Sequence, residues 1–373
     1  MSQINVRNLS NENDDGAPDI VGVSTFSATS YFVPPKGTTQ QRPENPQGGD
    51  LRFNTDTASL EYFRGDTLNW SQIEMTSPDL DGGARALWGG GTAPAQKDII
   101  DYVTISTLGD ATDFGNLSDV RFGVAGVASR TRAVFAGGYV NNIIEYVTFS
   151  STGNVTDFGD RTTTGAYPNG ASSQTRGIVV GGYQAPSVNN IMDYITIAST
   201  GNAVDFGNST QENWESGGCS SSTRAIFAGG RGDAPGYSFM GTIDYVEITT
   251  TGDAADFGDL TSVTSYGGAV SSNTRVVYAG GYSPSLTNKM EFFTTASAGN
   301  GTDFGDLITA RVILTGSSSN GIRGVLPGGY TGSDYNVIEF ITISTAGNAK
   351  DFGDLNKAKR ALSGSSDSHG GLS

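Results

Sequence analysis

The sequence contains one cysteine, one histidine and no long apolar run, and each shortage argues against a class of function. Cys219 is alone, so there is no disulfide framework and no cysteine-based metal site. His369 stands without the partner residues that catalytic triads and zinc sites require. No stretch approaches the roughly 18 apolar residues that would span a bilayer. We therefore expect a protein that is not an enzyme, has no cofactor and does not insert into membranes.

Basic residues are scarce as well. Lysine and arginine number 22 against 38 aspartates and glutamates, which gives a formal charge of −16. A nucleic-acid binder needs a basic stripe, so we expect no nucleic-acid partner. The segment from Met1 to Asp15 is polar and lacks the apolar core of a secretory signal, which favours synthesis in a host cytoplasm without secretion by that route.

What the chain does contain is a repeated pattern that begins near residue 85. Each copy has an arginine, a Gly-Gly pair five residues later, an acidic-aromatic pair and an Asp-Phe-Gly triplet. The copies are 44 to 51 residues apart, which indicates a repeat architecture. The six arginines are Arg85, Arg132, Arg176, Arg224, Arg275 and Arg323.

One copy, residues 119–160, predicts four short strands separated by turn residues. The second strand begins at Arg132 and stops at Gly137 and Gly138. We expect Phe158 to pack between sheets and Arg132 to bridge them. We expect Asp157 to accept backbone hydrogen bonds or to pair with a repeated arginine; a ring of such acids holding a cation is the alternative.

The two ends of the repeat region predict closure. Arg85 begins a second strand with no first strand before it, and residues 357–371 match a first strand with no second strand after it. A shared sheet would leave no exposed edge. The expected fold is therefore all-β, a six-bladed β-propeller closed by the C-terminal strand.

The order of arginine, Gly-Gly and two aromatic positions, followed by a further arginine at Arg121, Arg311 and Arg360, resembles the kelch repeat over about 290 residues. The last aromatic is phenylalanine where kelch repeats usually have tryptophan. The resemblance implies a divergent, kelch-like β-propeller over residues 77–373.

The first 76 residues do not repeat. Residues 1–48 predict an extended arm or linker with one short strand at residues 20–26, and residues 49–76 predict a small three-stranded β-meander. The run Gly-Asp-Leu-Arg-Phe-Asn-Thr-Asp-Thr at 49–57, with Tyr62 and Trp70, resembles a module of tail-fibre and other virion proteins of tailed cyanophages. That resemblance implies location in a virion, docking onto other virion proteins through residues 1–76, and a possible homo-oligomer.

Only one gap in each repeat varies freely. It follows the Gly-Gly pair and holds 6 to 13 residues. Insertions in repeat folds gather on one face, which is often the binding face. The candidate ligand-binding residues there are Tyr183, Tyr237, Phe239, Tyr282 and Tyr335.

These observations favour a non-enzymatic phage virion protein of tail-fibre, neck or tail-appendage type. Its propeller would contact a host-surface glycan or protein, or another virion protein. The alternatives are an intracellular kelch-type interaction module and, less favoured, a glycan-active enzyme with paired carboxylates in its central pocket.

Overall fold

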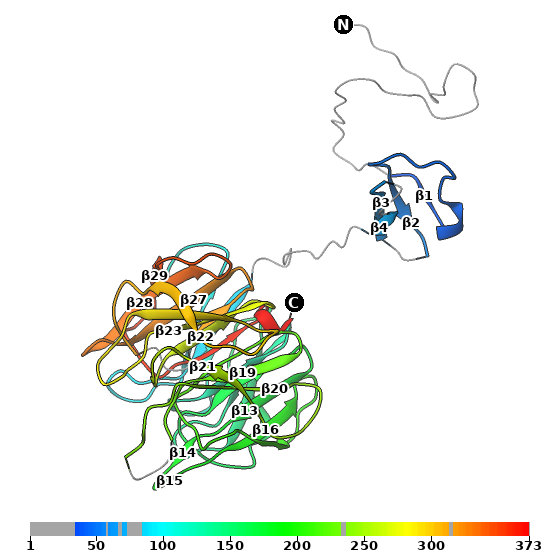
Figure 1. Cartoon of the computed structure of the whole chain (residues 1–373). Coiled ribbons are helices and arrows are strands. Elements are labelled where there is room, and N and C mark those ends of the chain that lie inside the picture. Colours follow the sequence, from blue (N-terminus) through cyan, green and yellow to red (C-terminus); the bar gives the residue numbers. More distant parts are fainter. Residues whose placement is uncertain are drawn as a thin grey trace, which may run out of the picture. The chain divides into compact units, whose positions relative to one another are not determined.

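The computed structural model describes residues 34–56, 59–65, 69–72, 84–232, 236–312 and 316–372. The chain divides into two compact units, Met1–Pro78 and Asp79–Ser373. Both are built from β-strands, and the helices within the described ranges are two 3-10 turns, η1 (Thr39–Gln41) and η2 (Gly370–Leu372) (Figure 1). The strand expected at residues 20–26 lies outside the described residues.

The first unit contains one four-stranded sheet. β2 (Leu51–Asn54), β3 (Ser59–Phe63) and β4 (Trp70–Gln72) form an antiparallel meander. A two-residue strand, β1 (Lys36–Gly37), adds to β2 in parallel. β1 lies in the segment expected to be an extended arm, so part of that segment belongs to the sheet.

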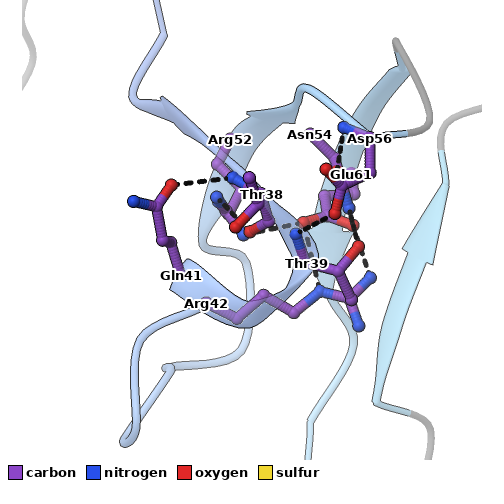
Figure 2. A network of polar contacts seen from close by, with 8 residues as sticks. All are labelled: Thr38, Thr39, Gln41, Arg42, Arg52, Asn54, Asp56 and Glu61. Atoms are coloured by element: carbon purple, nitrogen blue, oxygen red, sulfur yellow. Dashed lines mark hydrogen bonds and ion pairs between the residues drawn. The ribbon is translucent and has the colours of Figure 1, made fainter.

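A buried carboxylate organises this small sheet (Figure 2). Glu61 has no exposed surface, and its oxygens accept hydrogen bonds from Arg42, Arg52 and Asn54. Hydrogen bonding from Arg42, ahead of the other contributions, lowers the pKa of Glu61. Both guanidiniums also lie within 6 Å of the Trp70 ring centroid. Charge pairing and ring contacts therefore supplement a small apolar core.

The second unit consists mainly of six four-stranded antiparallel sheets, each with the strand order of the repeat. A short hairpin, β14 (Tyr183–Gln184) with β15 (Ser187–Val188), extends one loop. The first strands are β30 (Ser363–Ser366), β8 (Ala125–Ala128), β12 (Asn169–Ser172), β18 (Gly217–Ser220), β22 (Gly268–Ser271) and β26 (Ser318–Ser319). The second strands are β5 (Arg85–Gly89), β9 (Arg132–Ala136), β13 (Arg176–Val180), β19 (Arg224–Ala228), β23 (Arg275–Ala279) and β27 (Arg323–Tyr330). The third strands are β6 (Ile99–Thr104), β10 (Ile143–Thr148), β16 (Ile191–Thr196), β20 (Thr242–Glu247), β24 (Lys289–Thr294) and β28 (Asp334–Thr342). The fourth strands are β7 (Thr112–Asn116), β11 (Thr156–Asp160), β17 (Val204–Asn208), β21 (Ala255–Asp259), β25 (Thr302–Asp306) and β29 (Lys350–Asp354).

The C-terminal strand completes the sheet that opens the repeat region. β30 pairs antiparallel with β5, with Ser363 opposite Gly89 and Ser366 opposite Ala86. The predicted pairing of these two segments is confirmed. The first strand of each sheet also contacts the first strand of the next, and β26 contacts β30, so the series returns to its start.

Buried apolar side chains lie between consecutive sheets. Phe158 of β11 is 2% exposed and packs with Val179 and Ile195 of the following sheet. The same arrangement joins the last sheet to the first, where Phe352 packs with Trp88. Each sheet therefore covers the face of its neighbour, and the core is spread over the interfaces.

The repeated arginines bridge neighbouring sheets. Arg132 Nη1 donates a hydrogen bond to the carbonyl oxygen of Ile197 at 2.9 Å. Ile197 directly follows β16, the third strand of the next sheet. Its Cζ lies 4.4 Å from the Tyr146 ring centroid. Arg323 closes the series by donating to Ile105 O at 2.7 Å. The repeated arginine therefore stacks on the aromatic residue of the acidic-aromatic pair.

The Asp-Phe-Gly triplet makes a second contact between sheets. Gly201 N donates to Phe158 O at 2.7 Å, and Asp160 N donates to Asn202 Oδ1 at 3.1 Å. Gly159 has φ +145°, and a Cβ there would lie 2.5 Å from Gly201 O. The triplet needs glycine because the turn of the next sheet passes too close for any side chain.

Of the two roles expected for Asp157, the ion pair with a repeated arginine is not seen among the described residues, whereas in another repeat the equivalent Asp256 Oδ1 accepts a backbone hydrogen bond from Gly258 N at 3.1 Å. The side chain of Asp157 is exposed on β11. Within the described part of the second unit, four buried cations pair instead with the acid of the acidic-aromatic pair. These ion pairs are Arg121–Glu145, Arg161–Asp193, Arg311–Glu339 and Lys359–Asp101. The buried acid needs a partner because burial penalises an unpaired charge.

Candidate functional site

Residues from two positions of the repeat line one cavity. The first is the residue after Gly-Gly, where Gly137 (φ +66°) and Gly138 (φ +111°) turn the chain out of β9 in the left-handed region. The residues at this first position are Thr92, Tyr139, Tyr183, Arg231, Tyr282 and Tyr330. The second position lies ten residues after the aspartate of Asp-Phe-Gly, just before each first strand.

Residues at the second position also have left-handed backbone. The φ values are +59° at Gly123, +55° at Tyr167, +63° at Glu215, +61° at Tyr266 and +57° at Ala361. Bulky side chains at positive φ are uncommon and occur where the surrounding structure enforces them. The recurrence at one repeat position means that the connection into the first strand imposes this conformation.

The cavity has a volume of about 670 Å³, within the usual size range for small-molecule sites. We call it the tyrosine cavity. It is lined by Tyr167, Arg231, Tyr266, Tyr282, Leu286, Val312, Tyr330, Gly332 and Arg360. Four phenol rings and two guanidiniums therefore face one hollow, with little aliphatic surface between them.

Glu215 lies beside this cavity and is 1% exposed. Arg231 Nε lies 3.2 Å from Glu215 Oε2 and 3.2 Å from Ser265 Oγ. Burial raises the pKa of Glu215 to about 8, opposed by a hydrogen bond from Tyr266 and by the charge of Arg231. At neutral pH, Glu215 is therefore mainly the uncharged acid.

The two tyrosines next to Glu215 are partly buried. Burial raises the pKa of Tyr167 to about 12, and burial followed by the nearby Glu215 raises that of Tyr266. Both remain neutral phenols at physiological pH. They present ring faces and hydroxyl groups, and carry no charge that would repel an anion.

The two guanidiniums of the cavity are only partly covered. The side chains of Arg231 and Arg360 are 21% and 36% exposed. Arg231 Cζ lies 4.6 Å from the Phe239 centroid and 5.3 Å from that of Tyr266. Arg360 Cζ lies 4.4 Å from the Tyr330 centroid, and its Nε is 3.5 Å from Asp334 Oδ1. Aromatic contacts hold both cations at the cavity while leaving polar edges accessible.

Four of the five candidate ligand-binding residues lie at or near this cavity. Tyr282 lines it, and Phe239 packs against Tyr282 with centroids 5.6 Å apart. Tyr183 stacks on Trp214 at 4.7 Å, and Tyr237 meets Tyr183 edge-on at 5.7 Å. These residues form an aromatic cluster that leads to the wall of the cavity.

Tyr335 lies elsewhere. Its ring centroid is 5.2 Å from Arg311 Cζ, and its hydroxyl is 3.3 Å from Thr309 Oγ1. Tyr139 is 48% exposed and stacks on Phe122 at 5.1 Å. Neither residue lines the tyrosine cavity.

Sequence reasoning missed Tyr167, Glu215, Tyr266, Arg231 and Arg360. The candidate residues were selected among the aromatics of the variable loops, so the short connection before each first strand was not considered. A usable signal exists, because the second position is found by counting ten residues from each Asp-Phe-Gly aspartate. Aligned in this way, the pattern identifies Tyr167, Glu215 and Tyr266.

A second, polar cavity of about 50 Å³ lies among the first strands, bordered by serines and His369. His369 Nε2 lies 3.1 Å from Ala128 O, while Nδ1 accepts a hydrogen bond from Gly371 N at 3.1 Å. Burial lowers the pKa of His369 to about 4, so the ring is neutral and donates through Nε2. This space suits a few waters, not an organic ligand.

Within the described ranges, no group of three or more histidine, cysteine, aspartate or glutamate side chains is placed to hold a metal ion. In the same ranges, no helix is long and apolar enough to cross a membrane. The chemistry that the tyrosine cavity offers is ring stacking, hydrogen bonding and charge recognition. No protein-family model and no curated protein matches this sequence.

Proposed function

We propose that residues 79–373 form a six-bladed, kelch-like β-propeller closed by the C-terminal strand. The proposal rests on the six four-stranded sheets, the pairing of β30 with β5 and the contacts between successive first strands. Hydrogen bonds also run from the last sheet back to the first, since Gly109 N donates to Phe352 O at 2.9 Å. A cryo-EM map of the purified protein would display six radial sheets; a linear stack of sheets would refute the proposal.

The chain acts as a non-enzymatic structural protein of a phage virion, of tail-fibre, neck or tail-appendage type. Residues 1–76 attach it to other virion proteins, and the second unit contacts a host-surface glycan or protein. The observation that carries the binding role is the tyrosine cavity, where aromatic faces and guanidiniums converge. The module resemblance at residues 49–70 and the division of the chain at Pro78 support the docking role.

Particle composition tests the virion assignment. Purified phage particles, digested and analysed by mass spectrometry, should yield peptides from both units at a constant ratio to the tail proteins. Recovery of the chain only from the soluble fraction of infected cells, bound there to a cellular protein, would replace this function with that of an intracellular kelch-type interaction module.

A further inference from the structure

We propose that the tyrosine cavity binds an anionic saccharide, with the acidic group held by the guanidiniums of Arg231 and Arg360 and the sugar ring placed on tyrosine faces. This proposal rests on the binding function given above and specifies its ligand. The ligand class is a hexose-based unit that carries a carboxylate.

The departure of one sheet from the repeat is the first argument. At the position after Gly-Gly, four sheets have tyrosine, whereas the sheet containing β19 has Arg231. At the position before the first strand, Tyr167 and Tyr266 flank Glu215 on either side in repeat order. Neighbouring sheets fold with tyrosine at these places, so the fold does not require a charge. One sheet therefore places Arg231 and Glu215 in contact beside the cavity, where neighbouring sheets have tyrosine, and such a departure from the repeat is typical of a site.

The lining favours a saccharide over an extended peptide. Tyr167, Tyr266, Tyr282 and Tyr330 provide flat faces for the C–H surface of a sugar ring and hydroxyls for its polar edge. Leu286 and Val312 are the aliphatic side chains of the lining. A hollow of about 670 Å³ accommodates a compact ligand.

The charges favour an anion. Arg231 Nε contacts Glu215 Oε2 and Ser265 Oγ, and the Arg231 side chain is 21% exposed. Glu215, with its raised pKa, adds little negative charge at neutral pH. Planar guanidinium groups bind carboxylates through paired, charge-assisted hydrogen bonds. On a chain of net charge −16, a hollow with two arginines is a local site for an acidic group.

The test compares matched sugars on the full-length protein. Disaccharides that end in glucuronic or galacturonic acid are titrated by calorimetry, each beside the neutral counterpart that ends in glucose or galactose. We expect at least one acidic disaccharide to bind about tenfold or more tightly than its neutral counterpart, because only the acid makes charge-assisted hydrogen bonds. Tyrosine ring protons should shift in NMR spectra on its addition.

Variants locate the site. Arg231→Gln combined with Arg360→Gln should reduce the affinity for the acidic disaccharide to that of the neutral one. Lys350→Gln, which removes one positive charge from an exposed position on β29, should leave it unchanged. The proposal is overturned if acidic and neutral sugars bind equally, if the double variant binds like the wild type, or if the acidic peptide acetyl-Gly-Asp-Gly-amide binds while every sugar fails.

Failure here is separable from failure of the virion assignment. Particle mass spectrometry can succeed while every sugar fails, which would remove the ligand and keep the virion role. If the chain is absent from particles but binds uronic acids through Arg231, the virion role is removed and the ligand is kept.

Discussion

Replacement of Gly159 by alanine tests the contact that joins each sheet to the next. Its φ of +145° disfavours any side chain, at a cost of about 1–3 kcal/mol. The new Cβ would also lie 2.5 Å from Gly201 O and 2.9 Å from Asn202 N, both backbone atoms. Forcing this turn outward adds about 1–3 kcal/mol of overpacking and weakens the hydrogen bond from Gly201 N to Phe158 O.

Gly153 is the matched control. Its φ is +158°, and a Cβ built there meets nothing within 4 Å. Gly153→Ala should therefore carry the backbone cost alone, whereas Gly159→Ala carries the backbone cost and the clash. We expect Gly159→Ala to be less stable than Gly153→Ala by about 1–3 kcal/mol.

The assay is urea unfolding of the full chain, followed by tryptophan fluorescence and by circular dichroism. Trp88 is fully buried in the second unit and should report on loss of packing between its sheets. Equal destabilisation by the two substitutions would refute the reasoning, because it would mean that the turn of the next sheet does not pass close to Gly159.

Three further predictions concern stability. The folded state raises the pKa of Glu215 to about 8, so the stability that the protonated carboxyl contributes is fully present below pH 4.5 and is lost as the pH rises to 8. The free energy of unfolding of Glu215→Gln should therefore increase relative to that of the wild type by on the order of 4 kcal/mol between pH 5 and 8. A difference between the two proteins that does not change with pH would contradict this prediction. His369 affects the pH dependence of stability in the opposite direction, because its folded-state pKa near 4 makes the free energy of unfolding rise between pH 4 and 6.5. In unfolding curves measured at pH 4.5 and 7, His369→Gln should reduce that rise by about 2–3 kcal/mol. Arg132→Lys should cost about 1–2 kcal/mol through weaker stacking on Tyr146 and a displaced donor to Ile197 O, measurable as a lower midpoint in urea.

The repeat made the strands of the second unit predictable, because each strand is bounded by residues with a strong backbone preference. Gly137 and Gly138 end one strand, and the Gly153-Asn154 turn precedes another. The pairing of β30 with β5 followed from counting strands at the two ends. The exposed position of Asp157 did not follow, since spacing alone does not tell which of two acids on neighbouring strands faces inward.

The tyrosine cavity was only partly predictable. Tyr282 was found because aromatics in variable loops suit binding, and Tyr335 was selected on the same argument although it packs against Arg311. Glu215 was missed because residue type does not predict left-handed backbone outside glycine, asparagine and aspartate. Its pairing with Arg231 depends on how two segments meet at one cavity, which a linear pattern does not record.

The pairing of β30 with β5 has a consequence for synthesis of the chain. A ribosome makes β5 at the start of the repeat region and β30 only after the other five sheets have emerged. Throughout translation, β5 therefore presents an unpaired edge, which is prone to association with other strands. A product that stops before Ser363 keeps that edge open. Incomplete chains therefore differ from finished ones by an unpaired strand edge, the feature through which sheets associate and aggregate.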